Sequence, residues 1–220
     1  MKIVAAKQLL KANDQLAEEN RRHFSEAGVF VVNLVGSPGC GKTTLLEGLF
    51  AASADRLAPA VIEGDIAGQI DAERIAKLNV PVVQINTDGA CHLDAAMIAA
   101  AVEGFDLAAI DMLVIENVGN LVCTAGFDLG EHLRVVVLSV TEGDDKIAKY
   151  PAIFQRSDAL LITKIDLLEH TNFDVDRAVA DYRRLNADGQ VFQVAALTGQ
   201  AMDTLADWIV NQRKNQPDRV

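Results

Sequence analysis

The residues Gly36-Ser-Pro-Gly-Cys-Gly-Lys42-Thr43 follow the spacing G-x-x-x-x-G-K-S/T, which is typical of loops that hold nucleotide phosphates. Glycines in such a loop allow backbone N–H groups to surround phosphate oxygens where a Cβ atom would collide. We expect Lys42 to neutralise the β- and γ-phosphates and the Thr43 hydroxyl to coordinate Mg²⁺. The loop residues predicted to contact the nucleotide are Gly36, Ser37, Gly39, Cys40, Gly41, Lys42, Thr43 and Thr44.

Two acidic residues follow apolar runs elsewhere in the chain. Asp65 and Glu116 each lie where a predicted strand ends, and carboxylate oxygens there suit a nucleotide-bound Mg²⁺. We therefore predict that Asp65 and Glu116 form the catalytic set with Lys42, and that Thr43 joins the two carboxylates around the metal. The alternative role for Asp65 is to cap the following helix. Gly119 is predicted to offer a backbone N–H that senses the γ-phosphate.

The segment Thr163-Lys-Ile-Asp166 resembles the guanine-specifying Asn-Lys-x-Asp of GTPases, with Thr163 in the asparagine position. A carboxylate at Asp166 can accept hydrogen bonds from both N1–H and the N2 amino group of guanine, a pair that adenine lacks. Lys164 can lay its aliphatic stem along the base, and Ala196 lies in a second loop expected beside it. These residues favour GTP over ATP, and the alternative is a solvated Lys–Asp pair.

A third group combines thiols with an imidazole. Cys91 and His92 lie at the predicted start of a helix beyond the third strand-like run, and Cys123 follows the fourth run. Thiolate and imidazole suit Zn²⁺, Ni²⁺ or copper better than Mg²⁺, and three protein ligands leave one position open. The alternative is that these cysteines are small buried hydrophobes, the role we predict for Cys40. The histidines predicted to be surface residues without a partner are His23, His132 and His170.

Strand-like and helical patterns alternate along the chain and must position these groups. The strands are predicted at 29–35, 59–63, 81–85, 112–116, 134–140, 159–163 and 190–194, and the helices near 43–53, 68–78, 92–102, 147–156, 174–186 and 201–213. This alternation predicts an α/β fold with a doubly wound, mostly parallel sheet of about seven strands. Ligands of such sheets bind beyond the carboxyl ends of the strands, where these polar groups fall.

The pattern divides the chain into a helical segment at 1–28, a nucleotide-binding domain at 29–213 and a frayed tail at 214–220. The first segment predicts a modestly amphipathic helix that ends at Gly28. Its apolar positions are Leu9, Leu10, Leu16, Ala17 and Phe24. We expect this helix to pack on the domain, and the alternative is a free arm that binds a partner.

Composition narrows the class of protein. The 220 residues are 50% hydrophobic, which is enough for one substantial core. The net charge of −11 disfavours binding to nucleic acid. No apolar run is long enough to cross a bilayer, residues 1–28 are too polar for a signal peptide, and the 3 cysteines form no disulfide framework. We therefore expect a cytoplasmic protein with neither nucleic-acid nor membrane partners.

Collected in this way, the motifs resemble those of the HypB family, the GTPases that assist nickel insertion into NiFe hydrogenase. The resemblance runs from about Leu10 to the last helix. Its most specific parts are Asn86-Thr-Asp-Gly-Ala-Cys-His-Leu-Asp94 and Glu116-Asn-Val-Gly-Asn-Leu-Val-Cys123. It also includes Ala17-Glu-Glu-Asn20, Gly36–Thr43, Glu63-Gly-Asp65 and Val140-Thr-Glu-Gly-Asp-Asp-Lys146.

The resemblance implies a P-loop GTPase of the SIMIBI class that hydrolyses GTP slowly to GDP and phosphate. It implies a homodimer that GTP favours, with a site for Ni²⁺ or Zn²⁺ at the dimer interface made by Cys91, His92 and Cys123. Asp144 and Lys146 would lie near the dimer face. The implied partners are a smaller nickel chaperone of the HypA type, docked near the N-terminal segment, and, indirectly, the precursor of the hydrogenase large subunit.

The chain departs from the family pattern in two ways that matter. Residues 1–28 hold one histidine and no cysteine, so the nickel-binding or nickel-storing motifs of some members are missing there. Thr163 stands where the guanine motif has asparagine, which leaves the affinity for guanine open. Two alternatives of other classes remain: a P-loop kinase that phosphorylates a small metabolite, and a non-catalytic protein that sequesters metal.

Overall fold

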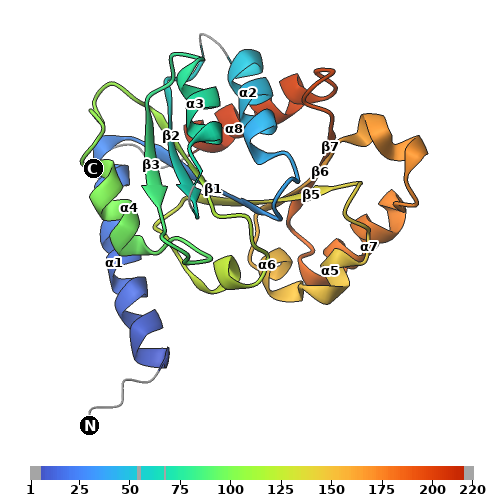
Figure 1. The fold of residues 1–220 in the computed structure, drawn as a ribbon, viewed down its shortest axis with the longest axis horizontal. Coiled ribbons are helices and arrows are strands. Elements are labelled where there is room, and N and C mark those ends of the chain that lie inside the picture. The colour runs from blue at the N-terminus through green and yellow to red at the C-terminus, as the bar shows by residue number, and fades with distance from the viewer. Residues whose placement is uncertain (1–5, 54–55, 67, 216–220) are drawn as a thin grey trace.

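The computed structural model describes residues 6–53, 56–66 and 68–215, and its centre is one sheet of seven parallel strands (Figure 1). The order across the sheet is β3-β2-β4-β1-β5-β6-β7. The strands are β1 (Phe30–Gly36), β2 (Pro59–Asp65), β3 (Val82–Asn86), β4 (Met112–Glu116), β5 (Leu133–Ser139), β6 (Ala159–Thr163) and β7 (Gln190–Val194). The predicted α/β fold is confirmed, and the sheet is entirely rather than mostly parallel.

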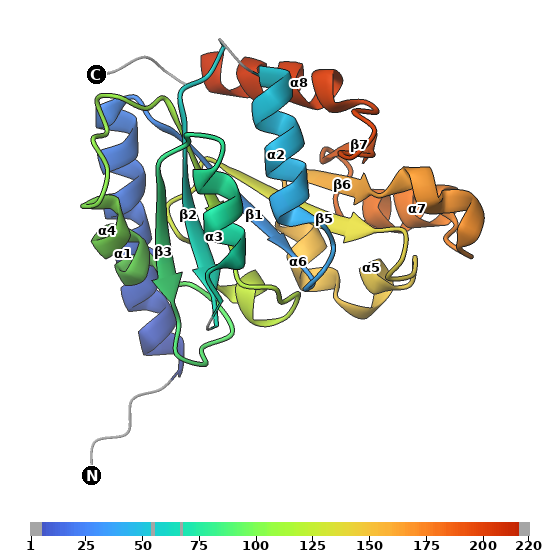
Figure 2. The ribbon, with the colours of Figure 1, turned by 45° about the horizontal axis from the view of Figure 1, so that its top comes forward.

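Helices cover both faces of this sheet. The helices are α1 (Ala6–Ala27), α2 (Lys42–Ser53), α3 (Ile70–Ala76), α4 (Ala95–Val102), α5 (Lys146–Lys149), α6 (Pro151–Gln155), α7 (Val175–Leu185) and α8 (Met202–Lys214), with short 3₁₀ turns η1 (Cys123–Gly126) and η2 (Ile165–His170). Figures 1 and 2 show α2, α3 and α8 on one side, and α1 beside α4 at one end of the sheet. None of the described helices is long and apolar enough to cross a membrane.

The central strand β1 explains how the two faces are filled. Its side chains alternate with a period of two, so Val32 and Leu34 pack toward α2 and α8, while Val31 and Val35 belong to cores on the opposite face. All seven residues of β1 are buried. One of them is polar: Asn33 has 0% of its surface exposed and lies on the face that carries Val31 and Val35.

Two predicted helices differ from those observed. The helix expected at 147–156 is split into α5 and α6 by Pro151, which has no N–H to donate and begins α6 after a non-helical Tyr150. The helix expected to start at Cys91 and His92 begins only at Ala95, because the Asp94 side chain caps it by accepting from Met97 N at 2.8 Å. Cys91 and His92 therefore lie on a loop.

Helix α1 ends at Gly28 as predicted, where φ is +70°. Its predicted apolar face is wrong in part: Leu10 and Leu16 are each 37% exposed. The buried positions are Asn13, Ala17, Asn20 and Phe24, which recur at helical spacing. The two asparagines explain the difference, because their side chains hydrogen bond to backbone groups near α4 and in the 128–129 loop. The Leu9 side chain and residues 216–220 of the predicted tail lie outside the described residues.

His132 is a further correction. The prediction of a surface position without a partner is wrong, because His132 is half-buried and its Nδ1 accepts a hydrogen bond from Val31 N at 2.9 Å. Its Nε2 lies 3.1 Å from the Ser25 hydroxyl at the end of α1. The sequence carries no signal for this role, because the two partners are about a hundred residues away along the chain. His23 and His170 are exposed, as expected.

Candidate nucleotide and metal site

The phosphate loop connects β1 to α2 and has the backbone conformation that its glycines allow. Gly39 and Gly41 have φ values of +74° and +97°, a region that side chains with a Cβ atom disfavour. Gly36 is required for a different reason, since a Cβ atom there would lie 2.7 Å from Cys40 Sγ and from the Val137 carbonyl. Helix α2 begins at Lys42, so its free N–H groups face the loop.

A cavity of about 430 Å³ opens above this loop at the carboxyl ends of β2 and β4. Five residues predicted to act on phosphate or Mg²⁺ line it together: Lys42, Thr43, Asp65, Glu116 and Gly119. The other lining residues are Pro38, Gly39, Gly41, Thr44, Glu63, Gly64, Ile66, Asp71, Arg74, Asn117, Val118 and Lys164. Ser37 instead lines a neighbouring hollow of about 240 Å³ with Val122 and Lys146.

Two buried carboxyl groups meet at the floor of the cavity. Glu116 Oε1 accepts a hydrogen bond from the Thr43 hydroxyl at 2.9 Å, and Glu63 is paired with Glu116 across the two strands. Burial raises the pKa of both groups, and the adjacent Glu116 raises that of Glu63 further. Among the described residues, one buried oxygen of each, Oε2, lacks a hydrogen-bond partner. Two adjacent buried carboxyl oxygens without a hydrogen-bond donor suit a divalent cation that prefers oxygen ligands, such as Mg²⁺.

Asp65 lies at the end of β2, half-buried on the wall of the same cavity. Its carboxylate accepts from the backbone N–H groups of Ile66 at 2.6 Å and Gly68 at 2.9 Å. The alternative role as a helix cap is wrong, because α3 starts at Ile70 and its N-cap is Gln69. Asp65 thus stands among the cavity residues with its carboxylate held by its own loop.

A smaller hollow of about 100 Å³ adjoins the phosphate loop on the side of β6. Its lining residues include the predicted base contacts Lys164, Asp166 and Ala196, together with Cys40 and Thr44. Lys164 has a φ of +58° and reaches the Gly39 carbonyl with its Nζ at 2.7 Å. The structure therefore brings the segment predicted to contact the base and the phosphate loop into direct contact.

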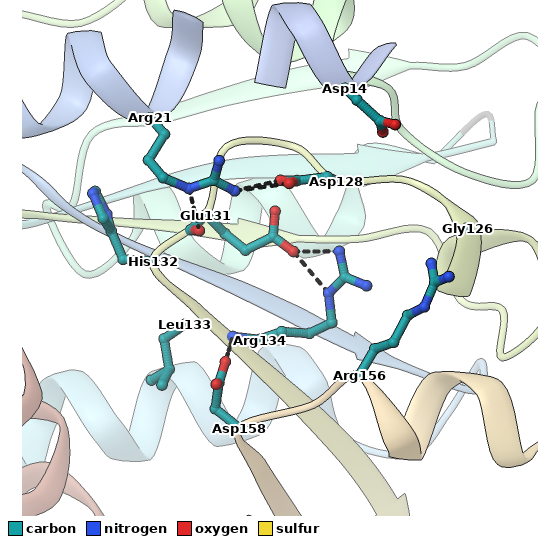
Figure 3. A pocket seen from close by; sticks show the side chains of 10 residues that line it. All are labelled: Asp14, Arg21, Gly126, Asp128, Glu131, His132, Leu133, Arg134, Arg156 and Asp158. Atoms are coloured by element: carbon teal, nitrogen blue, oxygen red, sulfur yellow. Dashed lines mark hydrogen bonds and ion pairs between the residues drawn. The ribbon is translucent and has the colours of Figure 1, made fainter. Parts of the chain in front are cut away.

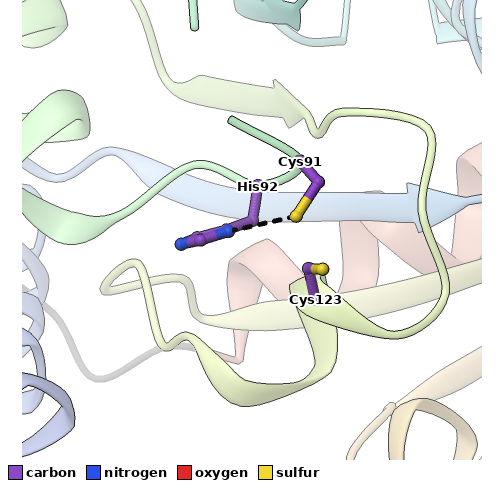
Figure 4. A group of neighbouring side chains, drawn as sticks. All are labelled: Cys91, His92 and Cys123. Carbon is purple, nitrogen blue, oxygen red and sulfur yellow. Dashed lines mark hydrogen bonds between the residues drawn. The ribbon is translucent and has the colours of Figure 1, made fainter. Parts of the chain in front are cut away.

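The two cysteines and the histidine also converge (Figure 4). The ligand atoms of Cys91, His92 and Cys123 all lie within 4.8 Å of one another, and Cys91 Sγ lies 3.8 Å from His92 Nδ1. His92 stacks on Phe127 with ring centroids 3.8 Å apart. Burial lowers the pKa of His92, so its imidazole is held neutral, which is the form that binds metal. All three side chains are half-buried, which keeps an opening toward solvent.

Among the cavity residues without a role assigned from the sequence, Glu63 and Arg74 are charged and contact residues of the site. Glu63 is visible in the motif Glu63-Gly-Asp65, but only the strand pairing shows that it faces Glu116. Arg74 projects from α3 and donates to Thr44 Oγ1 at 2.9 Å and to Glu47 Oε2 at 2.6 Å. An isolated arginine in a helix gives no sequence signal, because its neighbours depend on how the helix is placed.

A second large hollow, about 440 Å³, lies at the opposite, amino-terminal ends of the strands, near the start of β5 (Figure 3). Four of its charged residues form two ion pairs: Arg21 bonds Asp128 at 2.7 Å, and Arg134 Nε bonds Glu131 Oε1 at 2.7 Å. Arg134 and Glu131 are nearly buried. This cluster ties α1 to the base of the sheet.

Comparison with known proteins agrees with this geometry. Residues 30–193 match the family of CobW/HypB/UreG nucleotide-binding domains, so the fold and the phosphate loop define a P-loop nucleotide-binding domain of that class. Hydrogenase maturation factor HypB of Azotobacter vinelandii is 49% identical over 205 residues, which cover 93% of this chain and 68% of that protein. The HypB of Escherichia coli (strain K12) is 46% identical over 205 residues, which cover 93% of this chain and 71% of that protein. The chain belongs to the HypB family of hydrogenase maturation factors.

Solved structures support the same assignment. HypB from Helicobacter pylori in complex with nickel superposes with a TM-score of 0.87 at 37% identity, covering 92% of this chain and 95% of that one. HypB from Archaeoglobus fulgidus superposes with a TM-score of 0.86 at 36% identity, covering 92% and 99%. The resemblance drawn from the motifs is therefore confirmed.

Proposed function

We propose that this protein is a GTPase that delivers nickel during maturation of a NiFe hydrogenase, and that its nucleotide state controls its metal site. One observation carries the proposal: the loop that leads from β4 to Cys123 packs on the phosphate loop. A Cβ atom at Gly119 would lie 2.9 Å from Pro38. A change at the γ-phosphate that moved Gly119 would therefore move a loop that ends in a metal ligand.

Hydrolysis would rest on positioning and charge neutralisation. Lys42 and the N-terminus of α2 face the cavity and can stabilise negative charge on the phosphates. Thr43, Asp65 and Glu116 would hold Mg²⁺, which supplies further neutralisation when bound. Glu63 lies outside this set, and burial with Glu116 adjacent raises its pKa, so it is not a ready general base, which supports a slow intrinsic rate.

The remaining parts of the proposal concern nucleotide, cargo and partners. Asp166 and Lys164 in the hollow beside the phosphate loop support guanine as the base. Cys91, His92 and Cys123 would carry Ni²⁺ as cargo, and Zn²⁺ suits the same ligands. GTP would favour a homodimer in the cytoplasm. A nickel chaperone of the HypA type would exchange metal with it, on the path to the large-subunit precursor.

The test compares the affinity for Ni²⁺ of the GDP-bound protein with that of the protein bound to a non-hydrolysable GTP analogue. We expect the two affinities to differ, and the affinity for nucleotide to change with Ni²⁺ by the same factor. Cys91→Ala should weaken Ni²⁺ binding at least about tenfold while leaving the affinity for GTP unchanged, because the thiol lies outside the phosphate cavity. Equal Ni²⁺ affinities in both nucleotide states would contradict the proposal. Unfolding of Cys91→Ala would favour a packing role for this cysteine.

A further inference from the structure

Two buried asparagines lie beneath the site and are not explained by nucleotide or metal binding. Asn33 is in the middle of β1 with 0% of its surface exposed, and Asn117 follows β4 with 2% exposed. Burying an amide costs free energy unless its donors and acceptor are all satisfied. Asn33 interrupts an otherwise apolar strand, so its partners indicate what it does.

The two amides form a directed chain of hydrogen bonds. Asn117 Nδ2 donates to Asn33 Oδ1 at 3.2 Å, and Asn33 Nδ2 donates to Glu131 Oε1 at 3.1 Å. Glu131 is a nearly buried carboxylate held by the guanidinium of Arg134 (Figure 3). Because every donor points toward that carboxylate, the chain is polarised, and it leaves Asn117 Oδ1 as the acceptor at its far end.

The free end of this chain joins two functional loops. Asn117 Oδ1 accepts from Val118 N at 2.9 Å and from Leu93 N at 3.4 Å. Val118 precedes Gly119, the residue that packs on the phosphate loop. Leu93 follows the metal-site residue His92 directly in the chain.

Leu93 is itself fixed against β2, the strand that ends at the nucleotide cavity. Its side chain is fully buried, and a Cβ atom on Gly64 of β2 would lie 2.7 Å from Leu93 Cδ1. Gly64 separates Glu63 from Asp65, two of the cavity carboxyls. The loop that carries Cys91 and His92 is thus held at Leu93 by the packing of its buried side chain and by the amide oxygen of Asn117.

We propose that Asn117, anchored by Asn33, is the positioning residue that couples the phosphate-sensing loop to the loop of Cys91 and His92. Asn117 Oδ1 accepts from one N–H on each of the two loops. If it moves with one loop, its hydrogen bond to the other loop changes. A movement of Val118 toward or away from the γ-phosphate therefore changes the hydrogen bond between Asn117 Oδ1 and Leu93 N. This inference rests on the proposed function, since it assumes that nucleotide and metal affinities depend on each other.

The test uses the full chain and Ni²⁺ alone as the metal. The measured quantity is the ratio of Ni²⁺ dissociation constants in the GDP and GTP-analogue states, for wild type, Asn117→Ala and Asn33→Leu. Coupling factors of this kind are about 5–150-fold in general. Both variants should bring the ratio to about one. Asn33→Leu should also keep GDP affinity close to wild type, because Asn33 does not line the nucleotide cavity. Asn186→Ala, which removes a half-buried amide remote from the site, is the control and should keep the wild-type ratio.

The outcomes separate the inference from the proposed function. A ratio of one in wild type would overturn both. A wild-type ratio retained in Asn33→Leu and Asn117→Ala would overturn only the inference. If Asn117→Ala does not fold, the ratio measured for the isosteric variant Asn33→Leu decides between these outcomes. Hydrogen exchange of wild type adds a readout without substitution: protection of the Leu93 N–H should differ between the two nucleotide states, and equal protection would overturn the coupling role.

Discussion

Thr163 illustrates how one residue can depart from a motif and keep a role in the loop. Its hydroxyl donates to the Cys40 carbonyl at 2.8 Å and is buried, so it holds the segment predicted to contact the base to the phosphate loop. A single donor is enough for this contact, and threonine supplies one. Cys40 itself is fully buried, and burial raises the pKa of its thiol to about 11, which fits a packing role.

A prediction at this scale concerns Gly36. Gly36→Ala should destabilise the fold by about 1–3 kcal/mol and weaken GTP binding, because the added methyl would meet Cys40 Sγ and a β5 carbonyl at 2.7 Å. Thermal unfolding and titration of a fluorescent GTP analogue measure the two effects. Gly126→Ala is the matched control: no other group lies within 4 Å of the point that its added methyl would occupy, and it should behave as wild type. Wild-type GTP affinity in Gly36→Ala would show that the loop tolerates the methyl.

Among the elements, α1 has a larger structural role than its apolar pattern suggests. It is bound through Asn13 and Asn20 to the start of α4, and Phe24 enters the core under β1. His132 adds a contact from the chain before β5 to both β1 and the end of α1. Together these contacts join the N-terminal helix to the sheet.

His132 should make this junction sensitive to acid. Burial, with Arg21 nearby, lowers its pKa to about 4, so the imidazole is neutral in the folded protein near pH 5, whereas an unfolded histidine titrates at about 6.5. The unfolded chain therefore binds a proton that the folded chain does not, and this contribution to stability falls as pH drops from about 6.5 toward 4. His132→Asn keeps an acceptor for Val31 N and cannot be protonated in this range. Its melting temperature should fall less than that of wild type between pH 7.5 and 5.0, and an identical fall would remove His132 from the explanation.

For the whole molecule, two exposed apolar side chains lie near the nucleotide cavity: Ile66 lines it, and Ile70 precedes the lining residue Asp71. Ile66 is 48% exposed and Ile70 is 74% exposed, both beside the carboxyl end of β2. Exposed apolar side chains next to a ligand site are typical of a surface that a partner covers. In the proposed function this surface would face a second copy of the chain when GTP is bound.

We therefore expect a GTP analogue to shift the protein from monomer toward dimer in sedimentation velocity, and GDP to do so less. Ile70→Ser should weaken this dimer, because it removes apolar surface that the interface would bury, while nucleotide affinity of the monomer stays unchanged. Leu78→Ser is the control, since Leu78 is 42% exposed but lies beyond the opposite end of α3. A dimer that persists in Ile70→Ser would place the interface elsewhere.

The sequence by itself determined the local features of this protein: strands and helices from their apolar periodicity, the phosphate loop from its glycines, and the candidate ligands from residue type. Only the tertiary structure decided which distant groups meet. Nothing in the chain near Asn33, Glu63 or His132 indicates their partners, because side-chain contacts depend on strand order and helix placement. The start of α4 was also decided by the structure, because the Asp94 side chain caps the helix and leaves Cys91 and His92 on a loop. Chemistry follows from residue identity, whereas coupling between sites follows from packing.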